Sequence, residues 1–315
     1  MQRRVLLAST LAMPALAQPR PLRILTPFAA GGAVDTLARF LGSRITALTG
    51  QSVVVEPRPG AGGDLAMTAL AQAEPDGLTM AMVSDGAMVR NPLLRAALPY
   101  DPLRDFAPVS LMVLSWYAFA MHVSVPARDM AEFIAFARAR PGYVNYGSAG
   151  PGTLGHVIGA MIARDQGIDM QHVPYRGANL ALQDLLAGRL QFYALSSAGL
   201  LQMLRDPAVR VLAVTGAHRQ PSLPEAPTIT EAGFPAYDLN AFFGVAYPAR
   251  VPGAQVTAMG ALIGRIMAEP ESISWLQAQG YNLAYLGSDA FGAFLVEERR
   301  RWRGIIERTG VRLEG

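Results

Sequence analysis

Asn145-Tyr-Gly-Ser-Ala-Gly-Pro-Gly-Thr-Leu-Gly-His156 is a glycine-rich turn between a predicted strand and a predicted helix. A turn of this kind directs several backbone N–H groups toward one small volume, together with the hydroxyls of Ser148 and Thr153. The positive end of the helix dipole lies at the same place, so an anion is the expected occupant. The stretch therefore predicts an α/β fold in which strand, turn and helix form an anion site.

Two nucleotide-binding patterns match this turn in part. Gly147–Gly152 has the glycine spacing of a phosphate-binding P-loop, but Thr153 occupies the position of its lysine. Gly150-x-Gly152-x-x-Gly155 matches the dinucleotide fingerprint, which also needs an acidic residue about 20 positions later. The next strand ends instead in Pro174-Tyr175-Arg176, whose arginine suits a 2′-phosphate. An exported NADP-dependent enzyme therefore remains an alternative, although export disfavours a diffusible nicotinamide cofactor.

The rest of the mature chain alternates strand-like apolar runs with amphipathic, helix-like segments. Strands are predicted at Leu22–Thr26, Ser52–Glu56, Thr79–Ser84, Val109–Leu114, Trp116–His122, Val144–Gly147, Met170–Pro174, Gln191–Leu195, Val209–Thr215 and Phe242–Tyr247. Helices are predicted at Ala33–Leu48, Asp64–Ala73, Met130–Ala139, Thr153–Gln166, Asn179–Ala187, Ala198–Leu204, Gly253–Ala268, Pro270–Gln279 and Ser288–Thr309.

This alternation is the βαβ pattern of a parallel sheet covered on both faces, and it occurs twice, before and after about His122. We expect two lobes, each a mostly parallel sheet flanked by helices, with a ligand cleft between them. The C-terminal helices are expected to return and brace the first lobe. The predicted boundaries place residues 18–121 and 245–315 in lobe 1 and residues 122–244 in lobe 2.

The first residues have the pattern of a secretory signal peptide. Arg3 and Arg4 precede the apolar run Val5–Ala12, and Ala15-Leu16-Ala17 has the small–x–small form of a cleavage site. We therefore expect residues 1–17 to be a signal peptide cleaved near Ala17, and the mature protein to be periplasmic. The arginine pair leaves the general and twin-arginine export routes both open.

Composition excludes several classes of protein. The chain has no cysteine, so neither disulfides nor thiol chemistry contribute. All 27 basic residues are arginine, and the signal peptide holds two of them, which leaves 25 against 24 acidic residues, a net charge of +1. Nucleic acid is therefore not an expected partner. With 51% hydrophobic and 16% charged residues, the chain is expected to be compact rather than disordered.

A second turn, Pro27-Phe-Ala-Ala-Gly-Gly-Ala-Val-Asp35, repeats the design of the first. It follows the first mature strand and opens a helix whose N–H donors are free. Asp35 lies in the first helical turn, where we expect it to cap the helix rather than contact a ligand. Two such turns facing each other across a cleft would hold a small carboxylate.

Catalytic and metal-binding patterns are scarce. His122, His156, His172 and His218 lack metal-ligand spacing, and the chain has no G-x-S-x-G sequence. A nucleophilic Ser148 paired with His156 is disfavoured, and His156 is expected to form structural hydrogen bonds. Arg176, after a strand, is either a partner for a ligand carboxylate or a solvent-exposed loop residue. We expect no metal, no cofactor and no catalysis, with an exported hydrolase as a further alternative.

A series of motifs in the same order resembles the periplasmic solute receptors of tripartite tricarboxylate transporters, called Bug receptors. The motifs cover almost the whole mature chain. They are PFAAGGAVD at 27–35, EPRPGAGG at 56–63, PDGLT at 75–79, LPYDPLRDFAPV at 98–109, NYGSAGPGTLGH at 145–156, HVPYRG at 172–177, DLLAG at 184–188 and PEAPTITEAGFP at 224–235.

The resemblance implies a two-lobed, type II periplasmic-binding-protein-like fold that closes on a small organic carboxylate. It implies membrane permease subunits as partners, with a sensor kinase as the alternative, and a monomeric receptor. Carried over by position, the family's carboxylate site consists of Phe28, Ala29, Gly31, Ser148, Ala149, Gly150 and Thr153. Ser84, Arg176 and Ser196 are added to this ligand-binding set, with Asp35 and His156 as supporting or capping residues.

The chain departs from the family pattern at three places. Ala29-Ala30 replaces two prolines of the first loop, and Glu56-Pro57-Arg58 lacks the asparagine that often precedes the arginine. Family members often have an Asp-Asn pair where this chain reads Ala194-Leu195-Ser196-Ser197. An acid there would suit a ligand ammonium group, so its replacement by Leu195 favours a carboxylate that lacks an amine, apolar and aromatic acids included.

Overall fold

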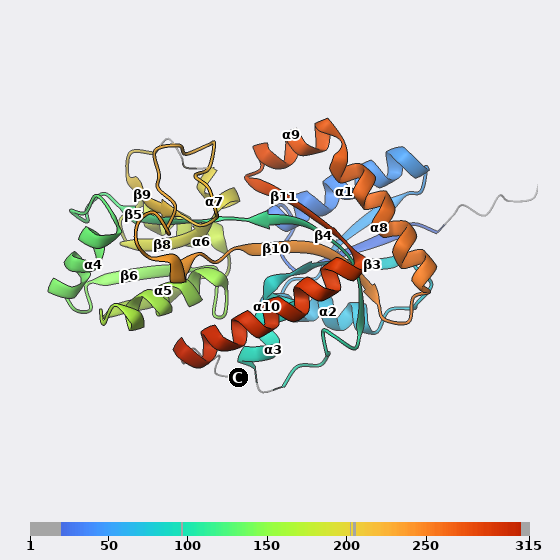
Figure 1. Cartoon of the computed structure of the whole chain (residues 1–315), viewed down its shortest axis with the longest axis horizontal. Coiled ribbons are helices and arrows are strands. Elements are labelled where there is room, and N and C mark those ends of the chain that lie inside the picture. The colour runs from blue at the N-terminus through green and yellow to red at the C-terminus, as the bar shows by residue number, and fades with distance from the viewer. Residues whose placement is uncertain (1–19, 96, 202, 204–205, 310–315) are drawn as a thin grey trace, which may run out of the picture.

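The computed structural model describes residues 20–95, 97–201, 203 and 206–309. The described chain forms two β-sheets side by side, and extended strands run between them (Figure 1). The predicted signal peptide at residues 1–17 lies outside the described residues. In the described part of the chain, no helix has the length and apolar character needed to cross a membrane.

The first sheet has six strands in the order β11-β4-β10-β3-β1-β2. Its strands are β1 (Leu22–Thr26), β2 (Val53–Pro57), β3 (Thr79–Ser84), β4 (Phe106–Ser115), β10 (Ala241–Pro248) and β11 (Tyr281–Gly287). β1 is parallel to β2 and β3, whereas β10 is antiparallel to β3 and β4, and β11 is antiparallel to β4.

The second sheet has five strands in the order β7-β6-β8-β5-β9. Its strands are β5 (Tyr117–His122), β6 (Val144–Ser148), β7 (Met170–Pro174), β8 (Phe192–Ser196) and β9 (Val209–Val214). β6 is parallel to β7 and β8, and β5 is antiparallel to β8 and β9.

The two-lobed α/β architecture is confirmed, but the sheets are mixed rather than mostly parallel. The reason lies in the strands that join them. β4 ends at Ser115 and β5 begins at Tyr117, so one residue, Trp116, separates a strand of the first sheet from a strand of the second. β10 later brings the chain back to pair with β3 and β4. β5 and β10 each enter their sheet directly from the other lobe. The direction of this crossing makes each of them antiparallel to its neighbouring strands.

The predicted lobe boundaries can be compared with these crossings. The boundary at 121/122 falls at the end of β5, and the boundary at 244/245 falls inside β10. Sheet membership changes at Trp116 and again between β9 and β10. Both predicted boundaries therefore lie on the strands next to the crossings rather than at the crossings themselves.

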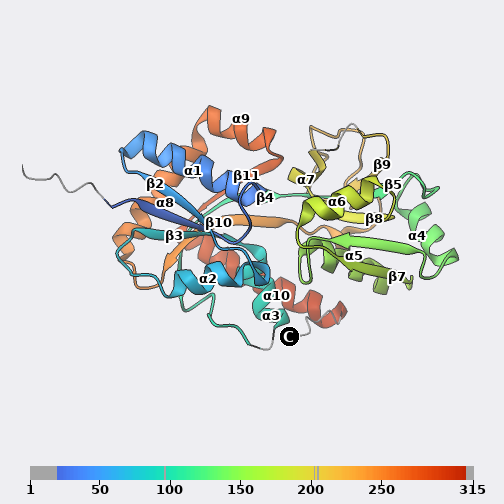
Figure 2. The ribbon, with the colours of Figure 1, turned by 180° about the vertical axis from the view of Figure 1, so that it is seen from behind.

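Helices cover the faces of both sheets (Figures 1 and 2). On the first sheet they are α1 (Ala33–Thr49), α2 (Asp64–Ala71), α8 (Gly253–Ala268) and α9 (Pro270–Ala278), while the short α3 (Asn91–Leu94) packs against η2 and α10. On the second sheet they are α4 (Met130–Ala139), α5 (Leu154–Asp165), α6 (Ala178–Leu186) and α7 (Ser197–Leu201). Three short helical turns are η1 (Ala61–Gly63), the π-helical η2 (Gly86–Arg90) and η3 (Pro235–Tyr237), and the last helix is α10 (Ser288–Thr309).

Most predicted elements are confirmed, and the bounds of β1, β3, α4, β7, α8 and α10 coincide with the prediction. The strand β11 and the η2–α3 segment were not predicted. β11 lies at the edge of the sheet, and after the buried Tyr281 all its residues are exposed or half-buried, so it lacks the apolar run by which the other strands were identified. Residues 202, 204 and 205, in and after the predicted helix Ala198–Leu204, lie outside the described residues.

One hydrophobic core runs through both lobes. Its largest cluster joins Phe242 of the first sheet with Phe119 and Phe192 of the second. Trp302 of α10 belongs to the same cluster, and α10 contacts β4, η2 and α5. The C-terminal helix therefore braces both lobes along one side, rather than the first lobe alone (Figure 1).

Candidate functional site

The residues predicted to bind a ligand lie at or after the carboxyl ends of strands. Phe28, Ala29 and Gly31 follow β1, Ser84 ends β3, Ser148 ends β6, Ala149, Gly150 and Thr153 follow β6, Arg176 follows β7, and Ser196 ends β8. β1 and β3 are parallel neighbours in the first sheet, as are β6, β7 and β8 in the second. The predicted residues therefore gather at one edge of each sheet.

The two edges face each other. Arg90, at the end of η2 after β3, donates a hydrogen bond from Nε to the carbonyl oxygen of Gly152 at 3.2 Å. The hydroxyls of Ser115 at the end of β4 and Ser197 at the start of α7 are 3.1 Å apart. Each contact joins an element of the first lobe to one of the second, so the turns after β1 and β6 lie on opposite sides of the same lobe boundary.

The two turns share a left-handed glycine and a backbone hydrogen bond. Gly31 and Gly152 both adopt the left-handed conformation, with φ of 78° and 76°. In each turn the next N–H group donates to a carbonyl three residues earlier, from Gly32 to Ala29 and from Thr153 to Gly150, both at 3.3 Å. A side chain is strained at such φ values, which explains glycine at the equivalent position of both turns.

The third residue of each helix completes the turn. The N–H of Gly31 donates to Oδ2 of Asp35 at 3.0 Å, and the N–H of Gly152 donates to Nδ1 of His156 at 3.1 Å. The acceptor is therefore a carboxylate in the first lobe and an imidazole in the second. Burial opposes ionisation of Asp35, but hydrogen bonds from Arg39 and Gly31 outweigh it and lower its pKa. The first turn holds a buried negative charge, and the second holds none.

A stack of rings supports the second turn from behind. The imidazoles of His156 and His172 lie 4.0 Å apart between centroids at an angle of 13°, and Tyr146 stacks on His172 at 5.0 Å. Nε2 of His172 is 2.7 Å from the hydroxyl of Ser148. Burial and the neighbouring His156 lower the pKa of His172 to about 4, and burial lowers the pKa of His156. The pair is neutral at pH 7, which the bond from Gly152 to an unprotonated Nδ1 requires.

The hydroxyls of the second turn are engaged within the protein. Ser148 is fully buried, and its Oγ accepts the N–H of Gly150 at 3.2 Å and lies 3.1 Å from the carbonyl oxygen of Gly150. The hydroxyl of Thr153 donates to the same carbonyl at 2.7 Å. These bonds fix the shape of the turn. The donors that remain for an anion are the N–H groups at the start of α5 and α1, which lack intrahelical partners.

The remaining predicted residues have different environments. Phe28 is exposed beside the first turn, and Ser196 is half-buried. Ser84 is buried and accepts the N–H of Ala87 at 3.4 Å. Arg176 is exposed and forms no ion pair or hydrogen bond with another described residue, so it is free to meet a ligand or solvent.

Sequence reasoning missed a buried cation at the lobe boundary. Arg90 is 5% exposed and pairs with Asp85, and its guanidinium lies 5.3 Å from the ring centroid of Trp302 in α10. Burial lowers the pKa of Arg90 to about 10, so it remains charged at pH 7. The sequence feature that could have indicated this cation is the polar pair Ser84-Asp85 at the end of a strand. The other site residues were predicted from the same kind of position.

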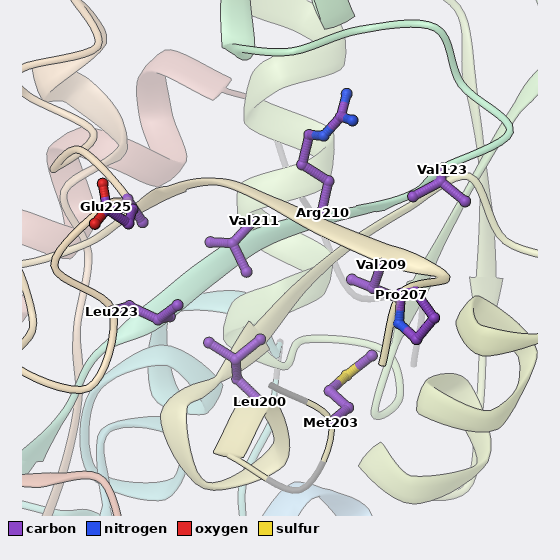
Figure 3. A pocket seen from close by; sticks show the side chains of 10 residues that line it. Val123, Leu200, Met203, Pro207, Val209, Arg210, Val211, Leu223 and Glu225 are labelled. Atoms are coloured by element: carbon purple, nitrogen blue, oxygen red, sulfur yellow. The ribbon is translucent and has the colours of Figure 1, made fainter. Parts of the chain in front are cut away.

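A cavity away from these turns has a different lining. A cavity of about 350 Å³ lies on the second lobe beside the edge strand β9, and it is lined by Leu200, Met203 and other apolar side chains (Figure 3). Arg210 extends away from these apolar side chains and donates to the carbonyl of Ala127 at 2.5 Å. The other charged residue that lines the cavity is the acidic Glu225. An apolar cavity with an acidic residue does not suit an anion. Among the described residues, no group of three or more His, Asp or Glu side chains could hold a metal ion.

Comparison with known proteins identifies relatives over almost the whole chain. A family model described as "Tripartite tricarboxylate transporter family receptor" matches residues 37–311. A protein encoded in the tcbD-tcbE intergenic region of Pseudomonas sp. strain P51 is 34% identical over 288 residues, which cover 91% of this chain and 85% of that protein. Protein BugT of Bordetella pertussis is 28% identical over 296 residues, 94% of this chain and 91% of BugT.

Solved structures share the fold. Rpa4515 of R. palustris, determined with adipate, is 29% identical with a TM-score of 0.87 and covers 93% of this chain and 98% of its own. MatC from Rhodopseudomonas palustris with bound malate is 27% identical with a TM-score of 0.82 and covers 93% and 100%. The periplasmic binding protein BugD is 25% identical with a TM-score of 0.83 and covers 93% and 99%.

Because the pKa of His172 is lowered in the folded protein, we predict that protonation of its imidazole at acid pH reduces the free energy of unfolding. Between the native pKa of about 4 and the usual value of 6.5, the unfolded chain binds more protons than the native one, so stability rises with pH. Acidification from pH 7 to pH 4 is expected to cost about 1–2 kcal/mol from His172, after reduction for its partial exposure. Urea unfolding at pH 7 and at pH 4 measures this loss of stability.

A His172→Gln variant is the control, since glutamine keeps a polar group near Ser148 but does not titrate in this range. The acid-induced loss of stability should be smaller in this variant than in the native protein. Equal losses in both proteins would show that His172 is not the responsible group.

Proposed function

The chain belongs to the tripartite tricarboxylate transporter receptor family, and we propose that it is a periplasmic receptor that captures a small organic carboxylate between its lobes. It then delivers the ligand to the membrane permease subunits of such a transporter. The family match supports the receptor role, and the relatives solved with adipate and malate support a carboxylate ligand. The predicted signal peptide at residues 1–17 supports export.

The observation that carries this proposal is the pair of equivalent turns at the facing edges of the two sheets. Each places a left-handed glycine before a helix N-terminus, and each is held in shape by bonds within the protein. Backbone N–H groups fixed in this way stabilise a carboxylate without the cost of ordering a long cationic side chain. We place the hinge for closure in the strands next to the crossings, β5 and β10.

We propose that the second turn binds an anion more tightly than the first turn does. The buried carboxylate of Asp35 opposes a second negative charge at the first turn, and Arg39 offsets this only in part because it is largely exposed. His156 performs the same structural task at the second turn without a charge. A ligand carboxylate is therefore attracted by the N-terminus of α5 more strongly than by that of α1.

The end of β8 supports a ligand without an amine. Leu195 is buried with 1% exposure, and Ser196 and Ser197 follow it. None of these residues carries the negative charge that an ammonium group would need in a desolvated cleft. The family receptors are solute-binding proteins, and we propose that this chain acts as a monomer without cofactor or catalysis. A receptor that signals to a sensor kinase is the second candidate, and adjacent genes for permease subunits would favour transport.

A panel of carboxylates in a thermal-shift assay tests the function, with mixtures analysed for any turnover. A ligand at about 100 times its dissociation constant adds about 2.7 kcal/mol, which raises the melting temperature measurably. Titration calorimetry then compares succinate with aspartate and glutarate with glutamate, and the acids without an amine should bind more tightly. Tighter binding of either amino acid contradicts the assignment at Leu195, and hydrolysis or oxidation of a ligand contradicts the receptor function.

Replacement of Thr153 by alanine should weaken carboxylate binding about tenfold without unfolding the protein. The change removes the bond that holds the carbonyl of Gly150, at a cost in stability of about 1 kcal/mol. Thr68→Ala is the matched control, because Thr68 makes a comparable bond to Asp64 on α2. If Thr153→Ala and Thr68→Ala bind carboxylates equally well, the second turn does not hold the ligand.

Replacement of His156 by aspartate should weaken carboxylate binding more than replacement by asparagine. Both side chains can accept the N–H of Gly152, but the aspartate adds a negative charge beside the turn. We expect a loss of tenfold or more for His156→Asp relative to His156→Asn, about 1.4 kcal/mol or more in binding free energy. The two variants are compared by titration calorimetry, and equal affinities would mean that the charge of this residue does not act on the ligand.

A further inference from the structure

Arg90 is a buried cation where the two lobes meet. It is the last residue of η2, the π-helical turn that follows β3 in the first lobe. Its Nε donates to the carbonyl oxygen of Gly152 in the second lobe at 3.2 Å. Gly152 is the left-handed glycine of the second turn. A cation of one lobe is therefore bonded directly to the glycine turn of the other.

The π-helical turn explains how Arg90 is held in this position. Its carboxylate partner Asp85 lies five residues earlier, and the backbone bonds of a π-helix join residues five apart, so the two side chains share one face. In an α-helix the neighbours on a face are three or four residues apart. Gly86 leaves room for the guanidinium, because a Cβ on this glycine would lie only 3.3 Å from Nη2 of Arg90.

The guanidinium is enclosed on its other sides as well. Its Nη1 pairs with Asp85, which is also buried, and the ring of Trp302 in α10 lies 5.3 Å from it. At the start of β5 in the second lobe, the charge of Arg90 opposes the rise that burial causes in the pKa of Tyr117. Arg90 therefore has little freedom to leave Gly152, and the low dielectric of its surroundings strengthens the charged hydrogen bond.

The bond from Arg90 acts on the peptide unit that starts α5. The carbonyl of Gly152 and the N–H of Thr153 belong to one planar unit, so a donor that fixes the carbonyl also fixes this N–H. Thr153 is the N-cap of α5. Within the turn, its N–H has only a long bond of 3.3 Å to the carbonyl of Gly150. The orientation of α5 and of its free N–H groups therefore depends on the bond from the first lobe.

We propose that Arg90 is a positioning residue for the ligand, and that its bond to the carbonyl of Gly152 fixes the second turn in the orientation that binds a carboxylate. The inference rests on the proposed function, because it takes the second turn to hold the ligand. Since Arg90 and Gly152 belong to different lobes, the bond requires the lobes to be together. The affinity of the second turn for an anion is thereby linked to closure.

Three variants separate the bond of Arg90 from the charge of Asp85. Replacement of Arg90 alone would leave a buried carboxylate without its partner, so the test variant is Asp85→Asn/Arg90→Met, which removes both charges. Asp85→Asn alone keeps Arg90 and its bond to Gly152. Arg44→Met/Glu269→Gln is the matched control, because it removes an arginine–glutamate pair that lies within the first lobe.

Titration calorimetry with succinate, glutarate, adipate and malate measures the effect on binding. For the acid that the native protein binds most tightly, Asp85→Asn/Arg90→Met should bind about tenfold more weakly or worse, which is roughly the contribution of one hydrogen bond to a charged group. Asp85→Asn and the control should stay within about threefold of the native affinity. Native affinity in the test variant, or equal weakening in Asp85→Asn, overturns the inference.

Hydrogen exchange without ligand provides a readout that a general loss of stability does not change selectively. The N–H groups of Gly152 and Thr153 are hydrogen-bonded within the second turn, so their exchange reports its order. In Asp85→Asn/Arg90→Met, peptides spanning 145–156 should exchange about tenfold faster than in the native protein, whereas peptides spanning 27–35 should keep the native rate. Equal acceleration at both turns would mean that the variant only destabilises the protein, and the inference would be wrong.

The two measurements distinguish this inference from the proposed function. If the native protein binds none of the carboxylates, the receptor function fails, while exchange at 145–156 still decides whether Arg90 orders the turn. If the test variant exchanges faster at 145–156 but binds the acids like the native protein, the receptor function stands and Arg90 does not position the ligand.

Discussion

The double passage of the backbone between two sheets is the constraint on which the rest of the molecule depends. The chain crosses at Trp116 and returns into β10, and both passages are anchored by hydrogen-bonded strand pairs on each side. These crossings turn the carboxyl ends of the parallel strands in one lobe toward those in the other. The edge at which an α/β sheet binds ligands thereby lies at the boundary between the two lobes.

The two glycine turns, at residues 27–35 and 145–156, share a left-handed glycine and an N–H bond to a helix side chain but differ in charge. Both need an acceptor on the third residue of the helix, because a left-handed glycine leaves its N–H directed there. The first lobe uses the ionised Asp35 and the second uses the neutral His156. Because both side chains accept the same backbone bond, replacing a charged acceptor by a neutral one affects the attraction of an anion rather than the fold of the turn.

Two contacts between the lobes lie beside the glycine turns. On one side Arg90, held by Asp85 and packed against Trp302, reaches the carbonyl of Gly152 in the second turn. On the other side Gly280 packs against α7. Any opening of the lobes changes both contacts, so the geometry of the second turn is coupled to closure.

Strand and helix periodicity and the two glycine turns could be recognised in the sequence, because they depend on neighbours within about a dozen residues. It also indicated the family through an ordered series of motifs. Other features depend on the tertiary structure. They are the antiparallel strands, the stacking of His156 on His172, the bond from Arg90 to Gly152 and the unpaired hydroxyl of Tyr281. Each depends on residues at least 16 positions apart, whose proximity is set by sheet order and lobe packing rather than by local pattern.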